Sequence, residues 1–510
     1  MPSIKLYSIS ALAGAIMVVG FAPFGFSFTP FLSLAALFYL WRISTAVRER
    51  FYIGLAFGFG LYLVGVSWVY VSLSTYGGMP LWMGSIAVLG FTGLLALIIA
   101  SMGLIFHHVV PNNVMSEGHT RAKAESNTQF TILFESLVLA ALWTLFEWTK
   151  SWLLTGFPWL DVGYTQTNTW LFAFAPIGGV YLISFAVATM AAIIVLGITN
   201  RKLIIPVGVG LILLISSYLL NNFQWSKSVG EALRVGVVQA NVPIDQKWQA
   251  EYRNNVIEHA AYLTRELNAE STLDLVVWPE TALPLYWQQT DDNFWNTIRP
   301  KSTALLTGLV DSSETDQQIY NAAALVCDGE AQVYRKRHLV PFGEYLPLRF
   351  LFNWVLEYLE LPMSDFSSWQ GQQNLNCGES IKIGLSICYE DAFAAEYRAH
   401  VGDATILVNI SEDAWFGDSL APHQRTQMAQ MRARELARPM IRSSNPGPSF
   451  VLDSLGNVQT ISKQYQVASF AEMVQPQIGD TPFKRFGNWI IYLSFLIVIV
   501  SLVAKRRDSV

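Results

Sequence analysis

One cysteine lies where an apolar stretch gives way to acidic residues. The run 383–387 ends at Cys388, and Tyr389 and Glu390 follow it directly. A lone cysteine usually fills a core position as a small hydrophobic residue. A cysteine between a strand and the first turn of a helix has a second use, because the first N–H groups of the helix favour a thiolate. The position therefore suits either a structural thiol or a nucleophile.

Two further polar residues support the interpretation of Cys388 as a nucleophile. Glu280 ends the apolar run VVWPE (276–280), where a carboxylate is unusual unless it is paired or used. Lys336 lies in VYRKRHLVPFGEY (333–345), and a compact ammonium can be aimed as a point charge. Strand ends on one edge of an α/β sheet converge, so the three residues can meet. Attack on an ester carbonyl needs a sulfur nucleophile, a base and an oxyanion donor, which Cys388, Glu280 and Lys336 would supply in that order. A structural Glu280–Lys336 ion pair is the alternative.

The composition predicts a membrane protein with an attached globular domain. Of the 510 residues, 52% are hydrophobic and 14% are charged, whereas a soluble domain carries about 25% charged residues. A membrane helix needs roughly 20 apolar residues. The chain contains eight apolar segments of about this length, which is too many for buried core helices of one protein. We therefore expect eight transmembrane helices. Their approximate positions are 5–22, 28–41, 52–73, 81–106, 130–149, 170–196, 203–220 and 487–504.

The distribution of cations predicts the orientation. One set of ends and loops carries eleven, and the short opposite loops carry only Lys150. The positive-inside rule then places both termini in the cytoplasm and the segment 226–484 on the outer face. Residues 1–22 also resemble a signal peptide, but no clean cleavage site follows, so we expect them to be retained. The eleven cations are Lys5, Arg42, Arg48, Arg50, Arg121, Lys123, Arg201, Lys202, Lys505, Arg506 and Arg507.

Three parts follow from this organisation: a membrane part at 1–225, an exported catalytic domain at 226–484, and a last helix with a tail at 485–510. In the exported domain, β-rich runs alternate with helical stretches and hairpins, which predicts an α/β sandwich with a mixed sheet. Asp328-Gly329 is a strong hairpin signal. The expected strands are 233–241, 273–280, 302–311, 321–336 (two strands), 381–388, 405–411 and 449–462 (two strands), and the expected helices are 246–268, 391–400 and 421–438.

The net charge, the cysteines and one apolar segment further restrict the possible functions and contacts. The net charge is −5, and no basic stripe with interleaved aromatics indicates nucleic-acid binding. Three cysteines in an oxidising compartment leave at least one unpaired; a Cys327–Cys377 bond is possible, although spacing alone cannot establish it.

Residues 345–370 are rich in large apolar side chains. They form either an insertion packed on its own domain or an arm at the bilayer surface, and the nearby membrane favours the arm.

The motifs resemble a known family. Cys-Tyr-Glu after an apolar strand, WPE upstream and a lysine between them resemble the Glu-Lys-Cys triad of the nitrilase, or carbon–nitrogen hydrolase, superfamily. Nearly the whole chain resembles the apolipoprotein N-acyltransferase family within it. The matching motifs are FAPFG (21–25), LLTGFPWLDVGY (153–164), VVQANVPIDQKW (237–248), WPETALP (278–284), HLVPFGEYLPL (338–348), ICYED (387–391), and DAWFGDS with PHQ (413–424).

The resemblance implies an eight-helix membrane domain that carries a periplasmic nitrilase-like αββα sandwich, in the bacterial inner membrane. Cys388 would take an acyl chain from a phospholipid, preferably phosphatidylethanolamine, as a thioester. The α-amino group of the diacylglyceryl-cysteine of an apolipoprotein would then accept it. Glu280 would be the proton acceptor and Lys336 the oxyanion stabiliser. The resemblance implies a monomer without metal or cofactor, and supporting roles for Glu344, Tyr389, Glu390 and Trp248.

Several positions depart from the family pattern. Ser411-Glu412-Asp413 stands where Asn-Asp is usual, and residues 445–449 (NPGPS) replace a run such as Asn-Thr-Gly. Lys150 replaces a common Arg and Ala240 a common Gly. These changes leave the triad intact and bear on the loops around it. His423 in the PHQ motif can be purely structural.

Two other functions compete with this one. A membrane-tethered amidase of the same superfamily would share the triad and use water as the acceptor, but it does not need seven spans before the domain. A transporter with an exported binding domain would leave the cysteine structural. Transporters usually have ionisable residues along the substrate path within the membrane. The predicted spans contain few such residues, with Glu135 and Glu147 as exceptions, which argues against a transporter.

Overall fold

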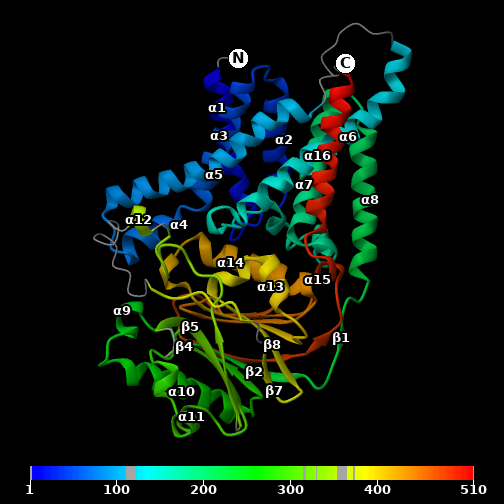
Figure 1. Ribbon diagram of the computed structural model, residues 1–510. Helices are drawn as coiled ribbons and strands as arrows, with labels where there is room; N and C mark the ends of the chain where they lie inside the picture. Colours follow the sequence, from blue (N-terminus) through cyan, green and yellow to red (C-terminus); the bar gives the residue numbers. More distant parts are fainter. Residues whose placement is uncertain are drawn as a thin grey trace. The chain divides into compact units, whose positions relative to one another are not determined.

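Figure 1 shows the computed structural model, which describes residues 3–110, 121–313, 317–328, 330–347, 349–352, 365–371 and 374–508. The chain divides into two compact units. The first comprises Met1–Tyr70, Leu81–Gln224 and Arg485–Val510, and the second comprises Val71–Pro80 and Trp225–Lys484. Residues 71–80 therefore pack with the second unit, although their sequence continues an apolar segment of the first.

The first unit is helical (Figure 1), and each of the eight predicted apolar segments contains a helix. In the described chain, five helices are long and apolar enough to cross a membrane, and a sixth span results if the pair Val47–Gly65 and Trp68–Tyr76, bent by 55°, is counted as one. The first two helices are shorter, so eight spans remain a prediction. The main helices are α1 (Ser3–Met17), α2 (Thr29–Ile43), α3 (Val47–Gly65), α4 (Trp68–Tyr70), α5 (Leu81–Val109), α6 (Arg121–Lys150), α7 (Ala175–Thr199), α8 (Ile204–Asn221) and α16 (Trp489–Asp508).

Small residues bring the helices of this unit close together. A Cβ atom on Gly60 of α3 would lie 1.9 Å from the carbonyl oxygen of Ala11 in α1, and one on Gly58 would lie 2.7 Å from the Cβ of Ala96 in α5. Close backbone approach of this kind is typical of packed membrane helices. The two acidic residues singled out in the spans are both bonded: Glu135 to Arg42, and Glu147 to the indole of Trp143. They are therefore structural partners, which argues against the transporter.

The second unit contains two six-stranded sheets, with strand orders β12-β11-β10-β9-β8-β7 and β13-β2-β3-β4-β5-β6. Alternate residues of one strand face opposite sides, so Val235 and Val237 of β2 belong to the core between the sheets and Val238 to an outer core. The strands are β2 (Leu233–Gln239), β3 (Leu275–Val277), β4 (Ala304–Ser313), β5 (Gln318–Cys327), β6 (Glu330–Arg335), β7 (Leu375–Cys377), β8 (Ile381–Ile387), β9 (Ile406–Glu412), β10 (Met440–Asn445), β11 (Phe450–Leu452), β12 (Val458–Ile461) and β13 (Ala468–Val474).

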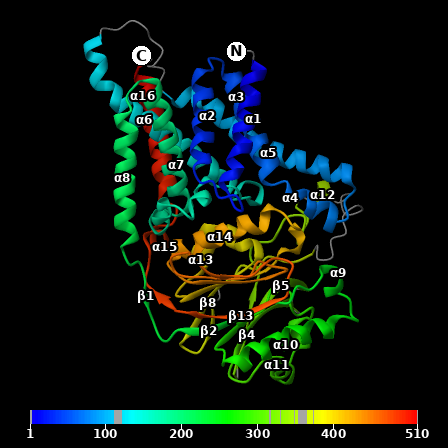
Figure 2. The ribbon, with the colours of Figure 1, turned by 180° about the vertical axis from the view of Figure 1, so that it is seen from behind.

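Helices cover the outer faces of both sheets (Figures 1 and 2). α10 (Arg253–Glu270) and α11 (Asp292–Ile298) pack on the sheet that holds β2 to β6, and α13 (Ala394–His400) and α14 (Leu420–Leu436) pack on the other. The four layers form the predicted αββα sandwich. The predicted hairpin pairing of β5 with β6 is confirmed, because Cys327 of β5 pairs with Glu330 of β6. The remaining elements include β1 (Lys227–Ser228), β14 (Gln477–Ile478), α9 (Ile244–Lys247), α12 (Arg349–Phe352) and α15 (Pro482–Phe486).

Much of the apolar segment 345–370 lies outside the described residues, so its role as an arm stays a prediction. Its described ends are attached to the second unit. Tyr345 bridges to Asp365, and Phe366 packs with Val310 and Leu339.

The possible disulfide is present. Cys327 at the end of β5 is bonded to Cys377 of β7, which joins the two sheets, and Cys388 is left as a buried free thiol. The bond closes a loop with a sequence separation of 50 that includes Lys336 and Glu344. Replacing both cysteines by serine should lower the free energy of unfolding by about 4 kcal/mol, because the unfolded chain regains the loop entropy. Denaturant unfolding of the purified protein, with Cys388→Ser as the matched control, measures this loss. Unchanged stability in the double variant would contradict it.

Candidate active site

Glu280 lies three residues beyond β3, in a segment that runs closely along β4. The amide of Trp278 donates to the carbonyl of Leu306 at 2.8 Å, and the amide of Gly308 donates to the carbonyl of Pro279 at 3.1 Å. A Cβ atom on Gly308 would lie only 2.7 Å from the Cα of Glu280. Glycine at this position therefore allows the Glu280 backbone to approach the sheet, and the Glu280 side chain is buried there.

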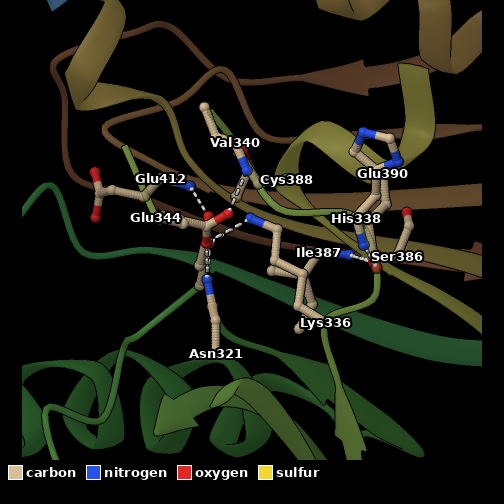
Figure 3. A network of polar contacts seen from close by, with 12 residues as sticks. Asn321, Lys336, His338, Val340, Glu344, Ser386, Ile387, Cys388, Glu390 and Glu412 are labelled. Carbon is tan, nitrogen blue, oxygen red and sulfur yellow. Dashed lines mark hydrogen bonds and ion pairs between the residues drawn. The ribbon is translucent and has the colours of Figure 1, made fainter. Parts of the chain in front are cut away.

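Lys336 follows β6, and its side chain points toward Glu344 (Figure 3). Its backbone amide donates to the carbonyl of Asn321 at 2.8 Å, which extends the pairing with β5. Its ammonium lies 2.8 Å from Oε1 of Glu344 and 3.5 Å from Oε1 of Glu280. Only 1% of Lys336 is exposed, so its charge is balanced by these two carboxylates rather than by water.

Backbone and amide donors fix both carboxylates. Asn321 Nδ2 donates to Oε1 of Glu280 and to Oε1 of Glu344, each at 2.7 Å. Oε2 of Glu280 accepts the amide of Glu412 at 2.8 Å, and Oε2 of Glu344 accepts the amide of Val340 at 2.8 Å. All four oxygens thus have a donor, which holds both carboxylates in place.

Cys388 is the first residue after β8 and has a left-handed backbone, with φ of 51°. Residues other than glycine rarely adopt this region, and such strain is concentrated at functional sites. Two donors hold the turn through the Cys388 carbonyl: Asn409 Nδ2 at 3.2 Å and Arg425 Nη2 at 2.8 Å. The strand therefore ends abruptly at the thiol, which is 7% exposed.

Burial and the neighbouring charges determine the protonation state of the Cys388 thiol before substrate binds. Burial raises the pKa of Cys388 to about 12; the Glu280 carboxylate also raises it, while Arg425 and Lys336 lower it. The thiol is therefore protonated at neutral pH, within electrostatic reach of both Glu280 and Lys336. Burial alone would lower the pKa of Lys336, but Glu344, Glu280 and Cys388 raise it above its usual value, so the ammonium stays charged. The arrangement suits transfer of the thiol proton to a carboxylate during attack.

Comparisons with known proteins identify the family. Residues 13–193 match the model described as the apolipoprotein N-acyltransferase N-terminal domain, and residues 234–481 match carbon-nitrogen hydrolase. Three relatives named apolipoprotein N-acyltransferase are 33%, 36% and 34% identical; they come from Methylococcus capsulatus, Nitrosomonas europaea and Pseudomonas aeruginosa. The alignments cover 99%, 97% and 98% of this chain and 97%, 97% and 96% of the relatives. The chain belongs to the apolipoprotein N-acyltransferase family.

A buried network behind Cys388 was not predicted from the sequence. Arg425 of α14 forms an ion pair with Asp413 and lies 3.4 Å from Asp391. Arg442 of β10 also pairs with Asp391 and donates to Oδ1 of Asn409 at 2.9 Å. Because Arg425 also holds the Cys388 carbonyl, these charges set the turn that carries the nucleophile. The sequence carries no clear signal for this network, because Arg425 lies in the polar run PHQRTQ (422–427).

Glu390 connects the nucleophile turn to the Lys336 segment. Its Oε2 accepts the amide of Ile387 at 2.7 Å and the hydroxyl of Tyr334 at 2.9 Å, and its Oε1 accepts the amide of Arg337 at 2.6 Å. Burial raises the pKa of Glu390, and these donors offset part of the effect. These contacts are the basis on which we propose a supporting role for Glu390.

The other two supporting residues differ in burial. Tyr389 is buried and packs edge-to-face on Phe393, with ring centroids 4.9 Å apart, and on His338 at 5.7 Å. Trp248 is 37% exposed, and no described contact joins it to the triad. The neighbouring Lys247 does contact Glu280. Within the described residues, no group of three or more His, Cys, Asp or Glu side chains could hold a metal ion.

Proposed function

We propose that this protein transfers an acyl chain from a phospholipid, by preference phosphatidylethanolamine, to the N-terminal amine of a diacylglyceryl apolipoprotein. The observation that carries the proposal is the buried free thiol of Cys388, which interacts electrostatically with the paired charges of Glu280 and Lys336. The relatives' printed name supports the acceptor, and their near-complete coverage supports the same activity for the whole chain.

The first half of the reaction forms a thioester. Glu280 takes the thiol proton as Sγ of Cys388 attacks the ester carbonyl, and Lys336 stabilises the oxyanion. Two of the three N–H groups of Lys336 serve Glu280 and Glu344, so one donor remains for the substrate. The ester C–O bond then breaks, and Glu280 returns the proton to the lysophospholipid oxygen. Glu344, Tyr389 and Glu390 hold the triad and its loops, and Trp248 lies in an entrance loop.

The second half transfers the chain. The acceptor amine attacks the thioester, Glu280 takes an amine proton, and the C–S bond breaks with return of a proton to Cys388. A dry apolar site favours this route because water would otherwise cleave the thioester. The apolar helices support membrane attachment, and we place the protein in the inner membrane with cytoplasmic termini, a periplasmic catalytic domain and no partner chain.

Intact mass spectrometry tests the proposal. After incubation with phosphatidylethanolamine, the purified protein should gain the mass of one acyl chain and lose it to hydroxylamine. Adding a diacylated lipopeptide should remove the chain from the protein and add the same mass to the peptide. A diether phospholipid, which has no ester, is the matched control. Release of free fatty acid with an unmodified peptide would show that water is the acceptor, as in the competing hydrolase, and the absence of a protein adduct would overturn the thioester.

A further inference from the structure

A second buried ion pair lies directly beside the proposed base. Lys247 at the end of α9 pairs with the Glu412 carboxylate at the end of β9. Both members also contact Glu280: the Lys247 ammonium donates to the Glu280 carbonyl at 2.9 Å, and the Glu412 amide donates to Oε2 of Glu280 at 2.8 Å. The two residues of this pair therefore hold Glu280 at its main chain, through the Lys247 ammonium, and at its carboxylate, through the Glu412 backbone amide.

Asn445 fixes the pair to a fourth segment. Its Nδ2 lies 3.2 Å from each oxygen of the Glu412 carboxylate and donates to the carbonyl of Val242 at 2.8 Å, and its Oδ1 accepts the amide of Val242 at 2.8 Å. The ends of β9 and β10 are thereby joined to the loop that leads to Lys247. Trp248 is the next residue, so the same contacts seat the start of its loop.

Stability alone is a weak explanation for this pair. Removing two charges from water costs several kcal/mol each, and apolar residues often replace buried ion pairs without loss. Glu280, however, is followed by Thr281 with φ of 47°, a conformation that a β-branched residue rarely adopts. Contacts on both sides of the Glu280 backbone and carboxylate are what keep such a segment in place.

We propose that Lys247 and Glu412 are positioning residues that aim Glu280 at the Cys388 thiol. The proposal deepens the function given above and rests on it. Neither residue needs to touch substrate. The charged Glu412 carboxylate holds the Lys247 ammonium against the Glu280 carbonyl. Loss of either charge allows the Glu280 carboxylate to move away from the position from which it takes the Cys388 proton.

The pair should make the reaction sensitive to pH. Burial raises the pKa of Glu412 to about 7, Lys247 and Asn445 lower it, and the Glu280 carboxylate raises it. The groups that face the Glu412 carboxylate are thus the Lys247 cation from α9, the Glu280 carboxylate beyond β3 and the neutral Asn445 amide from β10. Because the charged form of Glu412 makes the pair, the pair is present above about pH 7 and is lost as the pH falls through that value.

Single-turnover acylation of Cys388 from phosphatidylethanolamine, followed by intact mass between pH 6 and pH 8.5, tests the proposal. Wild-type protein should slow as the pH falls through about 7. Glu412→Gln should be roughly 10- to 100-fold slower at pH 8, since small misplacements cost that much, and should lack the change near pH 7. The concentration of phospholipid at half-maximal rate should stay the same. Lys247→Met should slow the step similarly, and Lys247→Arg should restore part of it.

Controls separate positioning from folding and from the function itself. Asp311→Asn breaks another ion pair, between buried Asp311 and half-buried Arg335 at 2.6 Å, and should keep the wild-type pH profile. If Glu412→Gln unfolds, the Lys247→Met and Lys247→Arg pair decides, and equal rates in both would overturn the proposal. A Glu412→Gln protein with the wild-type rate and profile would also overturn it. Failure of wild-type protein to form any thioester would instead reject the proposed function.

Discussion

Replacing Cys388 by alanine should abolish both the thioester and lipoprotein N-acylation while the protein stays folded. The sulfur is the only proposed covalent carrier of the acyl chain, so the rate should fall on the order of 10⁴-fold or more, as when other catalytic nucleophiles are removed. The fold should survive because the turn is held through the Cys388 carbonyl by Asn409 and Arg425, which the change leaves in place. Lipopeptide mass analysis measures the activity.

Cys388→Ser should be inactive as well, because a buried alcohol gives up its proton less readily than a thiol. Thermal unfolding of both variants against wild type checks the fold. N-acylation that persists in the alanine variant would remove the mechanism, whatever the stability of the protein.

Much of the site was predictable because its residues follow strand ends. Glu280, Lys336 and Cys388 come shortly after β3, β6 and β8, whose apolar residues the sequence displays plainly. Strand ends on facing sheets form one edge, so polar residues placed there converge. The alternation of strands and helices predicted an α/β sandwich with a mixed sheet, whereas the αββα arrangement of two sheets was expected only from the family resemblance. The disulfide did not follow, because only the fold brings β5 beside β7.

The contacts that position the triad were harder to predict. Asn321 lies within the apolar strand β5, and its two hydrogen bonds to Glu280 and Glu344 depend on strand register. The Glu412 amide that holds Glu280 is a backbone donor, which every residue except proline offers, so its sequence carries no signal. A few such donors fix the geometry on which the chemistry depends.

Residues 71–80 illustrate a different limit. The predicted apolar segment 52–73 includes their first three residues, yet residues 71–80 all pack with the second unit. There the Ser72 hydroxyl donates to the carbonyl of Trp415 at 2.9 Å, and the rings of Tyr76 and Trp415 meet at 6.3 Å. Hydropathy reports burial and does not distinguish a lipid environment from a protein surface.

Replacing Lys336 by methionine should destroy activity and lower stability together. Without the ammonium, the buried carboxylates of Glu280 and Glu344 share only the neutral Asn321 amide, and one of them must take a proton. Loss of a buried partner costs about 3–5 kcal/mol, and loss of one oxyanion donor costs roughly 10²- to 10³-fold in rate. Thermal unfolding and the acyl-adduct assay measure the two effects.

A second substitution separates charge balance from catalysis. In Lys336→Met with Glu344→Gln, one negative charge leaves with the positive one, so stability should recover most of its loss because Glu280 no longer faces a like charge. Activity should stay near that of the single variant, because the ammonium assigned to the oxyanion is still missing. Recovery of acylation together with stability would show that Lys336 serves only to balance its neighbours, and the assigned role in the transition state would be wrong.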